Sequence, residues 1–259
     1  MKLLEIKYKR FWINRIKRIE VPASWQEMNC DQFRASVDLF TNSLPDDVFI
    51  SRFFGIKLRF VKRLSAFEKY KLIELAEFLT GPKVATNFFY VKQIPGTDLL
   101  CPYPRLKGVS FEHFALFDTF FFDYVNDSSP QNLCRFVAAL YVAKKEKITG
   151  IDFEKRVRYI LKHVDYSILY AIFLNYTFIR RWLSGSFRYV FGYDNPDNDT
   201  PSKKKQPEKH RPDWSGILDS VVGDDILDYD KYRSTPCIII FKSINSRIEA
   251  YKKNGKSHK

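Results

Sequence analysis

Apolar and polar positions alternate in the first 22 residues with the period of two that is typical of strands. A second run, Arg15 to Val21, can pair back on the first, and Pro22 ends it because proline donates no ladder hydrogen bond. We therefore predict a β-hairpin over residues 1–22 that shows one basic face. Leu4, Ile6 and Tyr8 share one face of its first strand, and Glu5, Lys7 and Lys9 share the other.

After residue 22 the apolar spacing changes to three and four, which is typical of amphipathic helices. Asn29 with Gln32 three residues later has the spacing of a capping box and predicts a helix start. Another short helix is expected after Pro45, and residues 58–80 read as one helix or two. The predicted inward positions are Phe33, Val37 and Phe40, then Val48, Phe49 and Phe53, then Leu64, Phe67, Leu72, Leu75, Phe78 and Leu79.

Residues 81–109 interrupt the helical pattern. They hold four of the 12 prolines, and Pro95-Gly96 is a turn signal. We predict a loop with a short strand or a hairpin here.

The segment from residue 110 to 191 has the strongest helical pattern and is expected to form the core. Ser110 should cap one helix, and Ser129 with Pro130 should start the next. Two more helices are predicted over residues 151–163 and 165–191, the last apolar nearly all round through Tyr176.

Residues 193–212 have little to bury and predict a flexible linker. Helical stretches follow at 214–222, 225–232 and 236–253, and the last has Ile239, Ile240, Ile244, Ile248 and Tyr251 as apolar positions. The predicted fold class is mainly α: a multi-helix bundle core with a small N-terminal β-hairpin and a C-terminal helical appendage. The expected domains are a hairpin at 1–22, a helical core at 23–192 with an insertion at 81–109, a linker at 193–212, a helical segment at 213–253 and a basic tail at 254–259.

The 259 residues suffice for a sizeable core, and the cysteine pattern adds a prediction about compartment. Cys30, Cys101, Cys134 and Cys237 show no CxxC pair, so reduced, buried thiols are expected. The N-terminus lacks the features of a signal peptide, and the most apolar window is shorter than the roughly 20 residues of a spanning helix. We expect a protein without membrane association, located in the cytosol or packaged into an assembly made there.

The formal net charge of +13 is concentrated in four segments. Residues 1–20 carry net +5, residues 52–71 net +6, residues 202–212 net +4 and residues 242–259 net +5. Such clusters near aromatic rings suit nucleic-acid phosphates, but a solvated surface or docking to an acidic protein partner is the favoured interpretation. The candidate docking residues for a polyanion or partner are Lys7, Lys9, Arg10, Arg15, Lys17, Arg18, Lys203, Lys204 and Lys205.

The sequence contains no motif of a familiar catalytic or nucleotide-binding site. His113 and His163 lack metal-ligand spacing, which favours structural or surface roles. Asp224, Asp225 and Asp228 could hold a divalent ion, serve as helix-cap carboxylates or form an acidic docking patch, and the cap reading is favoured. We therefore expect a protein that is not an enzyme and has no catalytic, cofactor-binding or metal-binding residues.

The order of segments in the middle of the chain resembles a known group of proteins. Pro104 to Val109 leads into Ser110-Phe111-Glu112-His113-Phe114, Ala138-Ala139-Leu140-Tyr141 follows, and Trp214 opens a C-terminal helical piece. This order is similar to that of phage and prophage proteins of Bacteroides-type bacteria that are related to tail assembly chaperones. The resemblance covers residues 20 to 250, and its motifs mark helix starts and packing positions.

The resemblance implies a helical protein, made late in infection, that binds the tape measure or other tail components before the tail polymerises. A permanent virion component is compatible with the same pattern. The expected partners are other phage structural or tail proteins, including further copies of this chain, in the cytoplasm of the host bacterium or in the virion. A basic nucleic-acid-binding protein is the alternative.

Overall fold

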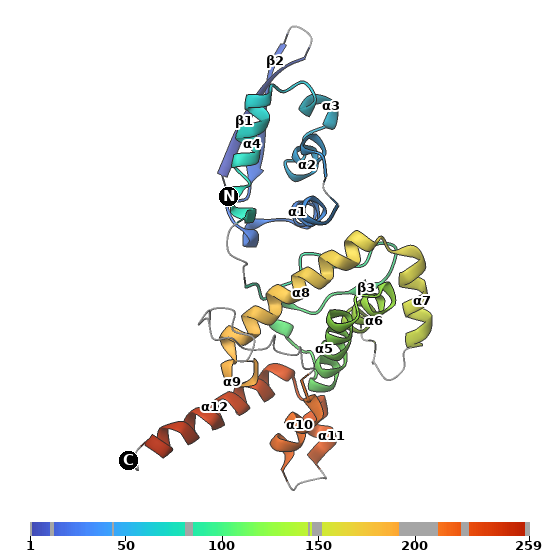
Figure 1. The fold of residues 1–259 in the computed structure, drawn as a ribbon, viewed down its shortest axis with the longest axis vertical. Coiled ribbons are helices and arrows are strands. Elements are labelled where there is room, and N and C mark those ends of the chain that lie inside the picture. Colours follow the sequence, from blue (N-terminus) through green and yellow to red (C-terminus); the bar gives the residue numbers. More distant parts are fainter. Residues whose placement is uncertain are drawn as a thin grey trace, which may run out of the picture. The chain divides into compact units, whose positions relative to one another are not determined.

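The computed structural model describes residues 2–10, 13–42, 44–80, 85–144, 146, 152–191, 212–223 and 228–256. These residues are mostly helical, and an antiparallel hairpin lies at the N-terminus, so the predicted mainly-α class is confirmed. The chain forms two compact units, Met1–Val84 and Ala85–Lys259 (Figure 1). Their boundary falls inside the segment 23–192 that was expected to form one helical core.

Unit 1 combines the hairpin with short helices. Strands β1 and β2 pair in one continuous antiparallel register from Lys2 opposite Val21 to Arg10 opposite Ile13. The elements are β1 (Lys2–Arg10), β2 (Ile13–Val21), η1 (Trp25–Glu27), α1 (Cys30–Asn42), α2 (Asp46–Phe53), α3 (Leu58–Val61), α4 (Ala66–Glu74) and η2 (Glu77–Thr80).

Local capping decides where two of these helices begin. The predicted capping box is present: the Asn29 amide donates to Gln32 Oε1, and the Gln32 amide donates to Asn29 Oδ1. A second box joins Ser65 and Glu68 and starts α4, so residues 58–80 form three short pieces.

Two predicted inward positions of unit 1 are exposed. Phe40 is 56% exposed and Phe67 is 65% exposed. In α4 the buried side chain is Leu72. Phe67 lies five residues earlier, and at 3.6 residues per turn this separation places it on a different face of the helix. The apolar spacing alone did not show which residues of this stripe meet the core.

Unit 2 is a helical bundle with one irregular segment. Its elements are β3 (Leu99–Leu100), η3 (Pro104–Leu106), α5 (Phe111–Asn126), α6 (Pro130–Leu140), β4 (Val142–Ala143), α7 (Phe153–His163), α8 (Tyr166–Ser186), α9 (Arg188–Phe191), α10 (Trp214–Val222), α11 (Tyr229–Ser234) and α12 (Cys237–Lys256). Helix α6 packs against α5, α7 and α8, and α12 packs against α5 and α9. The predicted caps Ser110 and Ser129 accept hydrogen bonds from the amides of His113 and Asn132.

The irregular segment 85–109 is held by polar side chains of the helices. Buried Asn175 on α8 accepts from the Tyr90 amide at 2.7 Å and donates to the Phe88 carbonyl at 3.1 Å. Tyr141 Oη donates to the Val91 carbonyl at 2.6 Å. These bonds satisfy backbone groups that a loop against a core would otherwise leave unpaired. The predicted short strand exists as β3, which pairs with β4.

The C-terminal segment belongs to the core of unit 2 and is not an appendage. Trp214 of α10 and Phe241 of α12 are buried against Phe114 of α5, with ring centroids 5.0 Å and 4.9 Å from that of Phe114. In α12 the predicted inward positions Ile239 and Tyr251 are exposed. The predicted linker 193–212 lies outside the described residues except for Pro212.

Candidate interaction surface

The most prominent exposed basic and aromatic side chains of unit 1 lie within 15 consecutive residues. We call this set the α3–α4 surface. All of its members are exposed: Lys57, Arg59, Lys62, Arg63, Phe67, Tyr70 and Lys71. This stretch is part of the segment 52–71 that carries net +6.

Helix α4 presents the rings of this surface on one stripe. Tyr70 and Lys71 lie three and four residues after Phe67, which places both on the same helix face as Phe67. Tyr70, like Phe67, is 65% exposed. The Lys71 ammonium lies over the Phe67 ring at 4.4 Å from its centroid.

Two acidic groups near this surface are already engaged. Glu68 Oε2 accepts from the amide and hydroxyl of Ser65, and these hydrogen bonds lower the pKa of the Glu68 carboxyl. Asp47 forms an ion pair with Lys69 at 2.8 Å. Among the described residues, no carboxylate forms an ion pair with Lys57, Arg59, Lys62 or Arg63. These four cations therefore have no ion-pair partner among the described residues, and the exposed rings follow within the same stretch of sequence.

The hairpin register separates the predicted docking positions. Residues opposite each other in an antiparallel pair share a face, and successive residues alternate. Positions 7, 9 and 18 therefore lie on one face, and positions 10, 15 and 17 lie on the other. The predicted single basic face is wrong.

One of these residues already has an acidic partner. Arg18 Nε donates to Glu5 Oε1 at 2.9 Å, and the two residues are opposite each other across the strands. For Lys7, Lys9, Arg10, Arg15 and Lys17 the structure gives the strand position, and Lys203, Lys204 and Lys205 lie outside the described residues. The docking role of all these residues stays a prediction.

The segment 52–71 stood out in the sequence by its charge, but its individual residues were not proposed as a site. The rings were missed because Phe67 was assigned to the core by its helical spacing. Tyr70 lies outside that apolar stripe and between Lys69 and Lys71, which was the available signal for an exposed ring.

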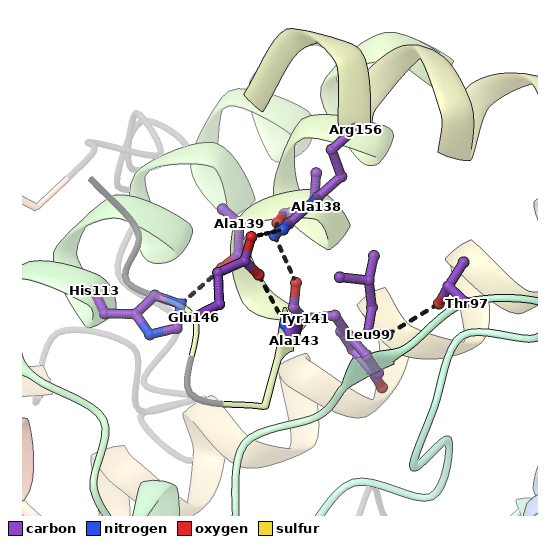
Figure 2. Close-up of polar contacts among 9 residues, drawn as sticks. All are labelled: Thr97, Leu99, His113, Ala138, Ala139, Tyr141, Ala143, Glu146 and Arg156. Carbon is purple, nitrogen blue, oxygen red and sulfur yellow. Dashed lines mark hydrogen bonds and ion pairs between the residues drawn. The ribbon is translucent and has the colours of Figure 1, made fainter. Parts of the chain in front are cut away.

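In unit 2, polar side chains concentrate at the C-terminal end of α6 (Figure 2). His113 Nε2 lies 2.7 Å from the Ala139 carbonyl, so this nitrogen carries the proton. The Arg156 guanidinium donates to the Ala138 and Tyr141 carbonyls at 3.3 and 3.2 Å and pairs with Glu146. These groups satisfy carbonyls that a helix end leaves without intrahelical partners.

The His113 ring is buried, and this burial lowers its pKa. The hydrogen bond to Ala139 acts in the opposite direction and is outweighed, and the charge of Arg156 lowers the pKa further. His113 is therefore a neutral structural donor at neutral pH, in agreement with the structural role predicted for it.

A second buried polar group lies deeper in unit 2. Asp118 is fully buried and accepts from Tyr176 Oη at 2.6 Å, from Trp214 Nε1 at 3.0 Å and from Arg180. The Arg180 guanidinium lies over the ring of Phe122 at 4.6 Å. This cluster joins α5, α8 and α10, and both carboxylate oxygens of Asp118 accept hydrogen bonds.

The acidic candidate site of the sequence lies only partly within the described residues. Asp224 and Asp225 lie outside the described residues, and Asp228 pairs with Lys231 at 3.3 Å. Within the described ranges, no three His, Cys, Asp or Glu side chains are grouped closely enough to hold a metal ion. In the same part of the chain, no helix is both long and apolar enough to span a bilayer.

No protein-family model matches this chain, and no curated protein or solved structure is significantly similar to it.

Proposed function

We propose that this protein is a non-enzymatic bacteriophage morphogenesis protein, of the tail assembly chaperone kind or a virion component, that acts by binding other phage proteins. The observation that carries the proposal is the α3–α4 surface, where Phe67 and Tyr70 are exposed within 15 residues of sequence that also expose five cations. Exposed rings and arginines are the residue types that dominate protein interfaces.

The partner that suits this surface is an acidic segment of another structural or tail protein. The two rings supply apolar area, and Arg59, Lys62 and Arg63 supply charge that steers an acidic partner. Rings with few rotatable bonds lose little side-chain entropy when they are buried at an interface.

Co-expression with the tail and capsid proteins of the same genome tests this proposal. The full chain should retain one of them in a pull-down, and the double variant Phe67→Ala/Tyr70→Ala should weaken the binding at least tenfold. The matched control is Tyr103→Ala, which removes a ring that is 71% exposed in unit 2. Failure to retain any such protein, or equal retention by the double variant and the wild type, contradicts the proposal.

Single-stranded nucleic acid is the second candidate partner, and the same surface favours it. Exposed rings next to cations provide stacking and phosphate contacts together. If this candidate is right, an oligothymidine should bind at low salt, and binding should weaken as salt rises. The triple variant Arg59→Gln/Lys62→Gln/Arg63→Gln should reduce the slope of log K against log salt by about 2, at about 0.7 per phosphate contact.

The control for this experiment is the triple variant Lys155→Gln/Arg158→Gln/Lys162→Gln on α7, which removes the same charge from exposed positions. Equal slopes for the two triple variants, or no binding at low salt, remove nucleic acid as a partner of this surface.

A further inference from the structure

A pocket of about 440 Å³ lies in unit 2, apart from the surface described above. It has the size of a small-molecule site. Its walls come from the segment before α5, from the end of α8 and from α12. Helix α9 contacts both α8 and α12 (Figure 1). The residues that line the pocket include Asn87, Arg105, Trp182, Lys242, Asn245 and Ser246.

The pocket lining is positive. Arg105 and Lys242 both line the pocket, and no carboxylate does so within the described residues. In the same part of the chain, neither cation forms an ion pair with an aspartate or glutamate. The charge in this pocket is therefore available to an anionic ligand.

The backbone at Arg105 is fixed in an unusual conformation. Arg105 has φ 59° and ψ 24°, and the next residue, Leu106, has φ 52°. Residues other than glycine adopt this left-handed region rarely. The Arg105 amide donates to the Asn87 carbonyl at 2.6 Å, and the side chain of Leu106 is buried. The hydrogen bond and the buried side chain together hold the turn in place. Arg105 is presented to the pocket from a rigid position.

Other residues of the pocket lining supply a ring and polar groups. Trp182 is half-buried and packs edge-to-face on Phe187, with centroids 6.4 Å apart. Asn245 accepts from the Tyr189 amide at 3.3 Å and donates to Glu249 at 3.2 Å, which orients its side chain. The Ser246 hydroxyl also lines the pocket.

We propose that this Arg105–Lys242 pocket binds a nucleoside 5′-phosphate group, in which a sugar joins the phosphate to an aromatic base. The guanidinium fork of Arg105 matches phosphate oxygens, and the Lys242 ammonium adds a second charge. The base packs on Trp182, as bases do on exposed rings. A free nucleotide and the phosphorylated end of a nucleic-acid strand share this chemistry. The inference does not depend on the α3–α4 surface or on a phage protein partner.

Titration of the full chain with adenosine monophosphate, followed by tryptophan fluorescence, tests the proposal. Parallel titrations with adenosine and with inorganic phosphate measure the contributions of the base and of the phosphate separately. A titration with a short 5′-phosphorylated oligonucleotide distinguishes the end of a nucleic-acid strand from a free nucleotide as the ligand. We expect a fluorescence change with the nucleotide or the oligonucleotide, and Trp182→Phe should abolish most of it. The variants Arg105→Gly and Lys242→Gln should each weaken binding about tenfold, as expected for loss of a charge-assisted hydrogen bond.

Arg105→Gly is chosen because glycine accepts the positive φ, so the variant removes the guanidinium without straining the turn. The matched control is Arg247→Gln, an exposed cation on α12 outside the pocket lining, which should leave affinity unchanged. Binding of either phosphorylated probe that depends on Arg105 and Lys242 supports the proposal. No binding of either probe, or binding that both pocket variants retain in full, overturns it.

Discussion

Arginine and phenylalanine are used in opposite ways in the two units. In unit 2 the Arg180 guanidinium is buried over the Phe122 ring and paired with Asp118. In unit 1 the Arg59 guanidinium lies over the Phe60 ring at 5.1 Å, remains exposed and pairs with no carboxylate of the described residues. Both contacts are of the cation–π kind. The two arginines differ in that a buried carboxylate compensates the charge of Arg180, whereas no carboxylate of the described residues compensates that of Arg59. An arginine with such a partner can be buried in the core, whereas one without it stays at the surface.

The rings show the same contrast. Phe114 is fully buried and meets Phe117, Trp214 and Phe241 edge-to-face. Phe67 is mostly exposed and contacts Lys71. Aromatic content therefore does not reveal by itself which rings build the fold and which remain available to a partner.

The largest effect is expected from Asp118→Asn. The substitution leaves Arg180 buried without its anion, and loss of one partner of a buried pair costs about 3–5 kcal/mol. Urea denaturation should show this loss in the free energy of unfolding. The control Glu112→Gln, on the same helix, removes a half-exposed partner of Arg233 and should cost less than about 1 kcal/mol. Equal losses of unfolding free energy in the two variants would mean that burial does not make the Asp118–Arg180 pair more important for stability than the Glu112–Arg233 pair.

Phe114→Ala should destabilise unit 2 by about 3 kcal/mol, because the ring contacts of three elements are lost and a cavity remains. Phe67→Ala should change the free energy of unfolding by less than about 0.5 kcal/mol, since the ring is already solvated. Denaturant midpoints of both variants measure the difference. A large loss in Phe67→Ala would place this ring in a packed interface within the chain.

His113 should make stability depend on pH. An unfolded histidine has a pKa of about 6.5, and burial lowers the pKa of His113 in the folded state. Between these two pKa values the unfolded chain binds more protons, so the free energy of unfolding rises with pH, by at most about 1.4 kcal/mol per unit. The stabilisation is complete above about pH 6.5 and is lost as the pH falls below it.

His113→Gln tests this dependence because the amide can still donate to the Ala139 carbonyl but does not titrate. Urea midpoints measured from about pH 5 to about pH 7 should vary less in this variant than in the wild type. An unchanged pH dependence would assign it to other groups.

The smallest effect is expected at the N-terminal cap of α4, the helix that carries Phe67 and Tyr70. Ser65→Ala removes the acceptor for the Glu68 amide at the start of α4 and should cost about 1 kcal/mol. Faster hydrogen exchange in the amides of α4 would report this loss. Ser220→Ala, in the exposed part of α10, is the control and should leave exchange in α4 unchanged.

The sequence predicted most reliably those features that neighbouring residues decide. The caps at Asn29, Ser110 and Ser129 form as predicted because each bond joins residues three apart. The inward face of α12 was predicted less well: Ile239 is exposed, whereas Phe241, which was not assigned to the core, is buried against Phe114. Helical spacing gives a stripe, but the position of the partner helices decides which edge of it is covered.

The sequence by itself determined the helical class, the hairpin, the helix starts and the segments that carry the positive charge. These follow from local periodicity, capping and composition, which act over a few residues. Only the tertiary structure decided that Trp214 and Phe241 complete the core around Phe114, that Asp118 compensates Arg180, and that Arg105 and Lys242 line one pocket. Each of these pairs is separated by more than 60 residues, so the contacts depend on how the helices pack and not on local preference.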